Sequence, residues 1–479
     1  MLAHVKSCSL LGIDAHVVDV EVDVSSGLPS FDLVGLPDTS VRESKERVRA
    51  AIKNTDFEFP VRRITINLAP ADTKKEGASL DLPIAMGILA ATEQVEQQKV
   101  EGFAFAGELS LNGDIRPING VLPMALELRE KGFKGFIVPI ENADEAVTAK
   151  GLEIYPMKNL KEVIGFFNNP GDFEHHVLST KKEDLLSNTD LDFKDIKGQE
   201  NLKRAFEIAA AGNHNILMVG PPGAGKTMIA KRMPSILPEM THDEAIEVTK
   251  IYSIAGLLPK GSGLMRTRPF RSPHNTISTS SLVGGGRIPK PGEITLAHYG
   301  VLFLDELPEF SREALEVLRQ PLEDEEVTIS RVNATITYPA KILLIGAMNP
   351  CACGYYGDPR RECICSVSQV MRYQNKISGP LLDRIDMQVE VPAVTYKELE
   401  DRAEGESSET VRKRVEEAKR LQLERYNSLN INYNNQLNLN QIYKFCALGR
   451  TEKKLMKTAY EKFKLTARGY TIVQVSNCS

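Results

Sequence analysis

The sequence predicts an α/β fold with a parallel sheet, and three stretches in its second half support that prediction. The first is the apolar run 215–219, which a glycine-rich loop and a helix-like segment from Met228 follow. The others are the apolar runs 300–304 and 342–345, which lead into polar side chains. Short apolar runs of this kind are typical of strands buried on both faces, as in parallel sheets. We therefore expect these strands to deliver their polar ends to a common site.

The glycine-rich loop has the pattern of a phosphate-binding site. It matches G-x-x-x-x-G-K-[ST], in which backbone N–H groups surround the phosphates of a nucleotide. In this pattern Lys226 binds the β and γ phosphates and the Thr227 hydroxyl binds Mg²⁺. A glycine-rich turn could match by chance, but the flanking strand and helix are the context that the motif requires. The predicted nucleotide-binding residues are Gly220, Pro221, Pro222, Gly223, Ala224, Gly225, Lys226 and Thr227.

Two carboxylates and one amide follow the other two apolar runs. Asp305 and Glu306 come directly after the run 300–304, and Asn349 ends the third strand. We predict that Asp305 holds the Mg²⁺ ion and that Glu306 polarises the water that attacks the γ-phosphate. The alternative for the two acids is a solvated helix start. Asn349 is predicted to orient the water or sense the γ-phosphate, although asparagine before proline is also a common turn residue.

Length and composition describe a protein of several domains. The chain has 479 residues, so two or three domains are expected. No apolar run approaches the ~20 residues of a membrane span, and the N-terminus lacks a signal pattern, so we expect a cytoplasmic protein. The net charge of −5 excludes a global basic surface, and any contact with nucleic acid must be local. Seven cysteines suggest thiols or metal ligands rather than a disulfide framework.

Residues 1–170 are predicted to form a separate domain of strands and helices. Segment 15–24 alternates as a half-buried strand does, and 82–91 is apolar all round, as a buried helix is. Leu36–Ile52 opens with a proline and a capping residue and carries one apolar face, which indicates an amphipathic helix. The polar segment 171–192 is then the linker to the next domain.

This first domain resembles the proteolytic domain of the Lon family, which is an α+β fold. Lys75–Ser79 is similar to the segment that carries the nucleophilic serine, and Gly107–Pro123 to the segment that carries the lysine base. A serine needs an adjacent base to become a nucleophile. The base position corresponds to Leu122, which cannot accept a proton. We therefore predict a non-catalytic domain in which Ser79 is a structural turn residue.

The predicted ATPase core, 193–395, contains a long insertion at 252–292. Loops of this length inside a nucleotide-binding core are usually functional. The basic residues of the insertion are expected either to contact nucleic-acid phosphates in a pore, or to solvate a loop or contact ATP across a subunit boundary. Residues 327–339 are predicted to form a hairpin, which in a ring would point towards the central channel. The basic residues are Lys260, Arg266, Arg268, Arg271, Arg287 and Lys290.

Four cysteines form two C-x-C pairs in the loop 351–365. Four thiolates suit a tetrahedral Zn²⁺ ion, although the usual spacing within a pair is C-x₂-C. Reduced buried thiols or a redox-sensitive loop are the alternatives. The candidate ligands are Cys351, Cys353, Cys363 and Cys365.

The nucleotide motifs, the insertion, the hairpin, Asn349–Gly354 and Ile377–Asp386 together resemble the Mg-chelatase-like AAA+ ATPases of the ComM/YifB family. The resemblance runs from Met1 to about Tyr470. It implies ATP and Mg²⁺ as cofactors, a hexameric ring, and helicase or branch-migration activity on single-stranded or branched DNA in natural transformation or recombination. The alternative is a protein-remodelling or chelatase-type AAA+ ATPase without DNA specificity. A Lon-like peptidase is a third reading, which Leu122 disfavours.

The same resemblance implies roles for two arginines. Arg384 is the candidate arginine finger, which reaches the γ-phosphate of the neighbouring subunit, and the alternative is an ion pair with a nearby aspartate. Arg468 resembles the sensor 2 arginine, which faces the nucleotide from a helical lid at 396–479. After Tyr470 the sequence departs from the family. We expect the continuing helix to be missing, as a truncated or frameshifted end would leave it, so that Arg468 lacks the packing that fixes it.

Overall fold

The computed structural model describes residues 1–75, 77–177, 191–259, 261–286, 289–331, 334–396, 400, 405–427, 429, 431–463 and 465–476. The chain divides into two compact units, of which the first comprises Met1–Leu186 and Ala245–Met265 and the second comprises Ser187–Glu244 and Arg266–Ser479. Most of the predicted linker, 171–192, lies outside the described residues. Among the helices that are described, none has the length and apolar character needed to span a bilayer.

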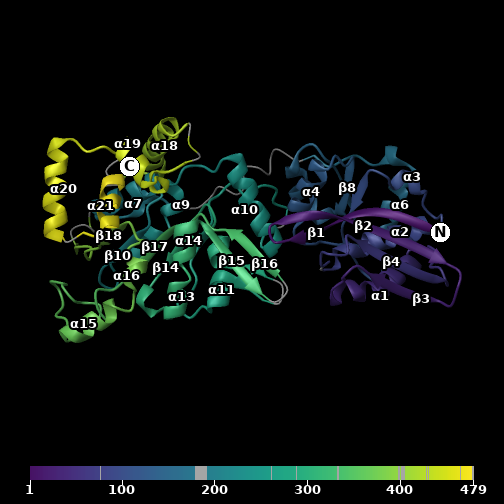
Figure 1. Cartoon of the computed structure of the whole chain (residues 1–479), viewed down its shortest axis with the longest axis horizontal. Helices are drawn as coiled ribbons and strands as arrows, with labels where there is room; N and C mark the ends of the chain where they lie inside the picture. Colours follow the sequence, from purple (N-terminus) through teal and green to yellow (C-terminus); the bar gives the residue numbers. More distant parts are fainter. Residues whose placement is uncertain are drawn as a thin grey trace. The chain divides into compact units, whose positions relative to one another are not determined.

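The first unit is built on a mixed seven-stranded sheet. Its long strands β1 and β2 pair antiparallel from Leu2↔Asp23 to Leu11↔Asp14 and lie side by side in Figure 1. β5, β8 and β9 continue the sheet in parallel from β1. The strand order is β3 (Ser30–Val34), β4 (Arg63–Ala69), β2 (Asp14–Ser25), β1 (Leu2–Leu11), β5 (Phe103–Phe105), β8 (Gly135–Pro139) and β9 (Glu153–Met157), and a small ribbon pairs β6 (Glu108–Leu109) with β7 (Ile115–Arg116).

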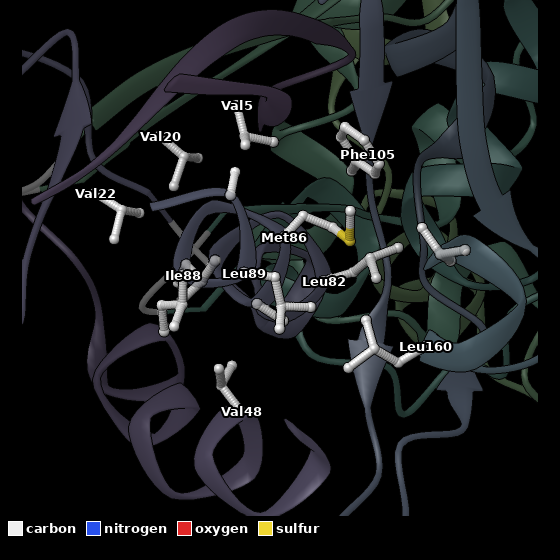
Figure 2. Packing of buried hydrophobic residues seen from close by; sticks show 14 of the residues in the cluster. Val5, Val20, Val22, Val48, Leu82, Met86, Ile88, Leu89, Phe105 and Leu160 are labelled. Atoms are coloured by element: carbon white, nitrogen blue, oxygen red, sulfur yellow. The ribbon is translucent and has the colours of Figure 1, made fainter. Parts of the chain in front are cut away.

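Helix α2 (Asp81–Ala91) forms the centre of this unit's core, as the apolar run 82–91 predicted. All eleven of its residues are buried. Figure 2 shows Met86 and Leu89 among the valines of the sheet, with Val48 of α1 (Thr39–Asn54) on the other side. A helix with apolar side chains on every face is stable only when neighbours cover all of them, and each fully buried large side chain contributes about 1.5–3 kcal/mol.

The remaining helices of the first unit pack on the strands of its sheet or on α2. The Asp38 side chain caps α1 by accepting from the Val41 N–H at 2.8 Å, which confirms the predicted capping residue. The other helices are α3 (Gln97–Val100), α4 (Val121–Glu130), α5 (Ala143–Ala146) and α6 (Leu160–Asn168).

Part of the predicted insertion belongs to the first unit rather than to the ATPase core. Helix α10 (His242–Ala255) begins in the second unit, and its residues from Ala245 belong to the first. The Ser253 hydroxyl donates to the buried carboxylate of Glu145, and the Ser253 carbonyl accepts from the Gly120 N–H at 3.2 Å. Lys250 pairs with Asp14 at 2.6 Å. The first unit is therefore assembled from two separated stretches of chain.

The second unit contains the predicted parallel sheet. Every neighbouring pair of its five strands is parallel. The spatial order is β11 (Phe270–Arg271), β14 (Val301–Leu304), β17 (Leu343–Met348), β10 (Ile216–Val219) and β18 (Met387–Glu390). The helices of this core are α7 (Glu200–Gly212), α8 (Lys226–Ala230), α9 (Met233–Ile236), α11 (Thr279–Val283), α12 (Glu293–Leu296), α13 (Arg312–Glu316), α14 (Arg319–Asp324), α15 (Val367–Gln374) and α16 (Gly379–Leu382).

Two hairpins project from this core. The predicted hairpin is confirmed as β15 (Glu326–Arg331) paired antiparallel with β16 (Ala334–Pro339). A second, short ribbon within the insertion pairs β12 (Gly284–Gly285) with β13 (Lys290–Pro291). The Tyr338 hydroxyl donates to the Pro289 carbonyl at 2.7 Å, so the base of the β15–β16 hairpin is joined to the residue that precedes β13.

The C-terminal part is helical, and its end differs from the expectation. The helices are α18 (Ser408–Arg425), α19 (Leu439–Phe445), α20 (Arg450–Phe463) and α21 (Ala467–Ser476). A short 3₁₀ turn (Asn434–Gln436) precedes α19. The prediction that no helix continues past Tyr470 is wrong, because α21 runs to Ser476. Val475 is buried in the lid core, and the Gln474 side chain donates to the Cys446 carbonyl at 2.6 Å, which gives this end of the chain its packing.

Candidate functional site

The sheet topology places three predicted segments at one edge. β17 lies between β10 and β14, with Ile345 opposite both Ile216 and Phe303. Parallel strands share the direction of their carboxyl ends, so the residues that follow them meet outside the same edge, where ligands of open α/β sheets bind. The phosphate loop (residues 220–227), the Asp305–Glu306 pair and Asn349 are therefore brought together.

The phosphate loop needs glycine at defined positions. Gly223 and Gly225 have φ of +76° and +85°, a region that side chains with a Cβ rarely adopt. Gly220 is required for a different reason, because a Cβ there would lie 2.3 Å from the Val391 carbonyl oxygen. Lys226 begins α8 immediately after Gly225, as the motif requires.

The surroundings of Lys226 suit the binding of an anion. Its Nζ donates to the carbonyls of Gly220 at 2.6 Å and Pro221 at 3.0 Å, and to Asn349 Oδ1 at 3.2 Å. These three partners are neutral, and burial lowers the pKa of Lys226 below its usual value, while Asp305 and Glu306 partly oppose this. A phosphate supplies the opposite charge that such a buried ammonium group lacks.

Thr227 and Asp305 form a pair of oxygens that fits Mg²⁺. Thr227 Oγ1 donates to Asp305 Oδ2 at 2.7 Å. Hydroxyl and carboxylate oxygens are the ligands that this hard cation prefers, and Mg²⁺ commonly uses few protein ligands together with the phosphates of its nucleotide. The structure brings the two expected metal ligands within hydrogen-bond distance, and their binding of Mg²⁺ stays a prediction.

Glu306 is held by a residue that the sequence did not identify. The Asn275 amide donates to Glu306 Oε2 at 3.0 Å, and Glu306 itself has a φ of +51°. A single asparagine in an irregular segment has no local signal for this role, because the contact arises only when the segment after β11 comes next to the end of β14. We therefore expect Asn275 to position the predicted base.

The two predicted arginines, Arg384 and Arg468, both act on the carboxylate of Glu323. Arg384 forms an ion pair with Glu323 through Nη2, and its Nε lies 3.0 Å from the same oxygen. The hydrogen bond and the charge of Arg384 lower the pKa of Glu323, and the charge of Arg468, in the first turn of α21, makes a smaller contribution in the same direction. The alternative of an ion pair for Arg384 is thus realised with Glu323 instead of a neighbouring aspartate. The roles of Arg384 and Arg468 in hydrolysis stay predictions.

Two of the basic residues of the insertion are committed to contacts inside the protein. The Arg268 side chain is only 6% exposed and donates to Glu244 at 3.0 Å and to the carbonyls of Pro238 and Tyr299. Arg271 binds both oxygens of Glu293, at 2.6 and 2.7 Å. These two arginines support the structure rather than a nucleic-acid surface. Lys260 and Arg287 lie outside the described residues.

The four cysteines of the loop come together. Sγ–Sγ distances are 3.3 Å for Cys351–Cys353, 3.7 Å for Cys351–Cys363 and 3.5 Å for Cys353–Cys363. The Cys365 sulfur is within 4.8 Å of the other three. Cys351 is buried and the other three are partly exposed.

Comparison with known proteins places the whole chain in one family. Models described as "Subunit ChlI of Mg-chelatase", "Magnesium chelatase, subunit ChlI" and "Magnesium chelatase, subunit ChlI C-terminal" match residues 20–142, 192–399 and 405–477. The competence protein ComM of Haemophilus influenzae is 44% identical over 99% of this chain and 92% of its own length. The uncharacterized protein YifB of Escherichia coli is 44% identical over 93% and 86%. The chain belongs to the Mg-chelatase-like AAA+ ATPases of the ComM/YifB family. The site is therefore that of an AAA+ ATPase, with ATP and Mg²⁺ as its cofactors.

The first unit of this AAA+ protein also shows the expected similarity to Lon. Lon protease 2 of Bacillus subtilis is 29% identical over 38% of this chain and 34% of its own length. Ser79 lies buried in a 3₁₀ turn (Ala78–Leu80), and Leu122 is fully buried in the first turn of α4. The burial of both residues agrees with structural roles, and the absence of peptidase activity stays a prediction.

Proposed function

We propose that this AAA+ ATPase is the subunit of a hexameric ring that moves single-stranded or branched DNA, as a helicase or branch-migration translocase in natural transformation or recombination. The choice of DNA as the substrate rests on the outer face of the β15–β16 hairpin. On this face Thr328 pairs with Thr337 at 3.2 Å and Ser330 with Thr335 at 3.0 Å, and all four side chains are exposed. Hydroxyl groups commonly contact the phosphates and sugars of nucleic acids.

Two further observations support this choice. The opposite face of the hairpin packs inward through Val327, Ile329 and Tyr338, so the hydroxyl face is the one presented outward. The similar protein from H. influenzae is named a competence protein, and the similarity covers nearly its whole length. Since Arg268 and Arg271 are engaged internally, we place the DNA contact on the hairpins and on exposed Lys290 of β13.

The proposed chemistry assigns one task to each residue. Lys226 binds the β and γ phosphates, Thr227 and Asp305 hold the metal, and Glu306 accepts the proton of the attacking water. Asn349 transmits the presence of the γ-phosphate to the β15–β16 hairpin. This is possible because β16 leads directly into β17, and Asn349 lies at the end of β17.

The arginines complete the site in the ring. Arg384 leaves Glu323 to contact the γ-phosphate of the adjacent subunit, and Arg468 stabilises the nucleotide from the lid. The cofactors are ATP and Mg²⁺, and a Zn²⁺ ion at the cysteine cluster is an additional structural constituent. We propose a cytoplasmic protein with a non-catalytic Lon-like domain (1–170), a linker (171–192), an ATPase core (193–395) and a lid (396–479).

The test is ATP hydrolysis with and without single-stranded and branched DNA. Glu306→Gln is expected to retain ATP binding and to lose roughly 10²–10⁴-fold in turnover, as for removal of a general base. The double variant Thr335→Val, Thr337→Val keeps the strand shape and is expected to lose DNA stimulation with basal hydrolysis unchanged. Thr458→Val, on α20, is the matched control. Hydrolysis that is indifferent to DNA contradicts the proposal and favours a protein-remodelling ATPase.

A further inference from the structure

We propose that Cys351, Cys353, Cys363 and Cys365 bind one Zn²⁺ ion, and that this ion fixes the loop between β17 and α15 against the nucleotide site. The metal site is independent of the substrate of the motor. Its effect on hydrolysis rests on the ATPase function proposed above.

The sulfur positions match a tetrahedral zinc site. A Zn–S bond of about 2.3 Å in a regular tetrahedron separates neighbouring sulfurs by about 3.8 Å. The Sγ–Sγ distances among Cys351, Cys353 and Cys363 are 3.3, 3.5 and 3.7 Å, and all four sulfurs lie within 4.8 Å of one another. Small movements of side chains are enough to bring every sulfur to the metal–ligand distance. As the ion binds, the thiols release their protons.

Disulfide bonds do not account for this arrangement. A disulfide requires about 2.05 Å between sulfurs and draws two of them away from the others. Here three sulfurs form a nearly equilateral triangle, so no single pair is selected. The other described cysteines, Cys8 and Cys446, are buried elsewhere and do not join the cluster.

The surroundings of the cluster suit bound thiolates. The N–H of Cys365 donates to Cys363 Sγ at 3.4 Å, and the N–H groups of Tyr355 and Ile364 hydrogen-bond to Cys353. Four thiolates and one Zn²⁺ leave two negative charges. Arg372 lines the same pocket as Cys353 and Cys365 and supplies compensating positive charge, whereas Lys376, which also lines it, pairs with Glu309 at 3.1 Å. Such outer contacts orient ligands and raise the affinity of metal sites.

The loop is joined to the ATP site at two points and to α15 at a third. Cys351 comes two residues after Asn349, whose side chain accepts from Lys226. Gly354, at a φ of +88°, lies so close to the phosphate loop that a Cβ would be 2.7 Å from Pro222 Cδ. The Gln374 side chain at the end of α15 donates to the Pro350 carbonyl at 3.0 Å. A loop that loses its metal therefore loses the support that places both Asn349 and Pro222.

Metal analysis of the purified full chain tests the site itself. About one zinc ion per chain is expected in the wild type and in the control Cys446→Ser, and less than about a tenth in Cys363→Ser, Cys365→Ser. Because the double variant is also open to misfolding, the wild type is titrated with a mercurial thiol reagent in the presence of a colorimetric zinc indicator. Zinc release that accompanies the reaction of four thiols supports the site. A zinc-free wild type, or zinc retained by the double variant, overturns it.

Hydrolysis and nucleotide binding test the coupling. Zinc removal from the wild type is expected to reduce ATP turnover roughly 10–100-fold, since displacement of a catalytic group by about 1 Å costs about 10²-fold. Re-addition of Zn²⁺ is expected to restore it. Full turnover by the zinc-free protein overturns the coupling and leaves the metal site standing. Zinc-dependent turnover without DNA stimulation contradicts the DNA proposal alone.

Discussion

Replacement of Arg47 by leucine tests what holds helix α2 in the core of the first unit. Asp81 is fully buried, and Arg47 contacts both its oxygens, with Nε–Oδ2 at 2.6 Å and Nη2–Oδ1 at 3.0 Å. In R47L the carboxylate keeps the Leu109 N–H, at 3.3 Å. Breaking a buried pair costs about 3–5 kcal/mol. Because the Arg47 side chain is 21% exposed, we expect the lower end, about 3 kcal/mol.

Hydrogen exchange of the full chain, followed by mass spectrometry, measures this loss of stability at helix α2. A loss of about 3 kcal/mol corresponds to roughly hundredfold faster exchange of α2 amides, with α7 amides of the second unit as the internal reference. Replacing both partners by leucine in R47L/D81L is expected to recover most of the loss, since no charge is then left buried. Exchange accelerated less than about tenfold in R47L, or a double variant less protected than R47L, would refute the reasoning.

The Arg47–Asp81 pair also predicts that the stability penalty of R47L depends on pH. Burial raises the pKa of Asp81 above its usual value even with Arg47 present, which acts in the opposite direction. Without Arg47 the pKa rises further, so the folded chain binds the proton more tightly than the unfolded chain. The penalty in R47L should therefore shrink as the pH falls through that raised pKa. A penalty that grows on acidification contradicts this account.

Three further outcomes are expected. Burial acts to raise the pKa of Glu207, but hydrogen bonds from Arg414 and Arg204 hold it below its usual value. Glu207→Gln should therefore lose about 1 kcal/mol of unfolding free energy at pH 7 and progressively less as the pH falls below about 4.3, as urea denaturation at each pH would show. Val475→Ala should cost the lid about 1.5–2 kcal/mol, measured as faster hydrogen exchange in α21, and unchanged exchange would contradict its packing role. Asn275→Ala should lower ATP turnover about fivefold with ATP affinity unchanged, the equivalent of one hydrogen bond of about 1 kcal/mol. Unaltered turnover would exclude Asn275 as a positioning residue.

Local patterns predicted those parts of the fold that local forces determine. The apolar runs 215–219 and 300–304, with their polar ends, are sufficient to predict strands and the residues that follow them. Helix α2 was predicted because no solvated helix carries apolar side chains on every face. The contacts of Lys226, Thr227, Asp305 and Asn349 follow from topology, since parallel neighbouring strands end at one edge.

Features that depend on distant contacts were not predictable in this way. Asn275 and Glu323 act on residues far away in the sequence, and nothing in their own segments marks them. Thr471–Ser476 is rich in β-branched residues, which are weak helix formers, and burial of Val475 with the hydrogen bond of Gln474 overrides that preference. The division of α10 between two units likewise depends on tertiary contacts such as that between Ser253 and Glu145.

That division has a consequence for how the protein is made. The first unit includes residues 245–265, which are synthesised after the phosphate loop. Domains usually fold in the order in which they leave the ribosome. Here the amino-terminal unit stays incomplete, with the Glu145 carboxylate lacking the Ser253 hydroxyl, until synthesis has passed residue 265. A fragment that ends at residue 170 lacks this second stretch, and the two units are completed in an interleaved order along the chain.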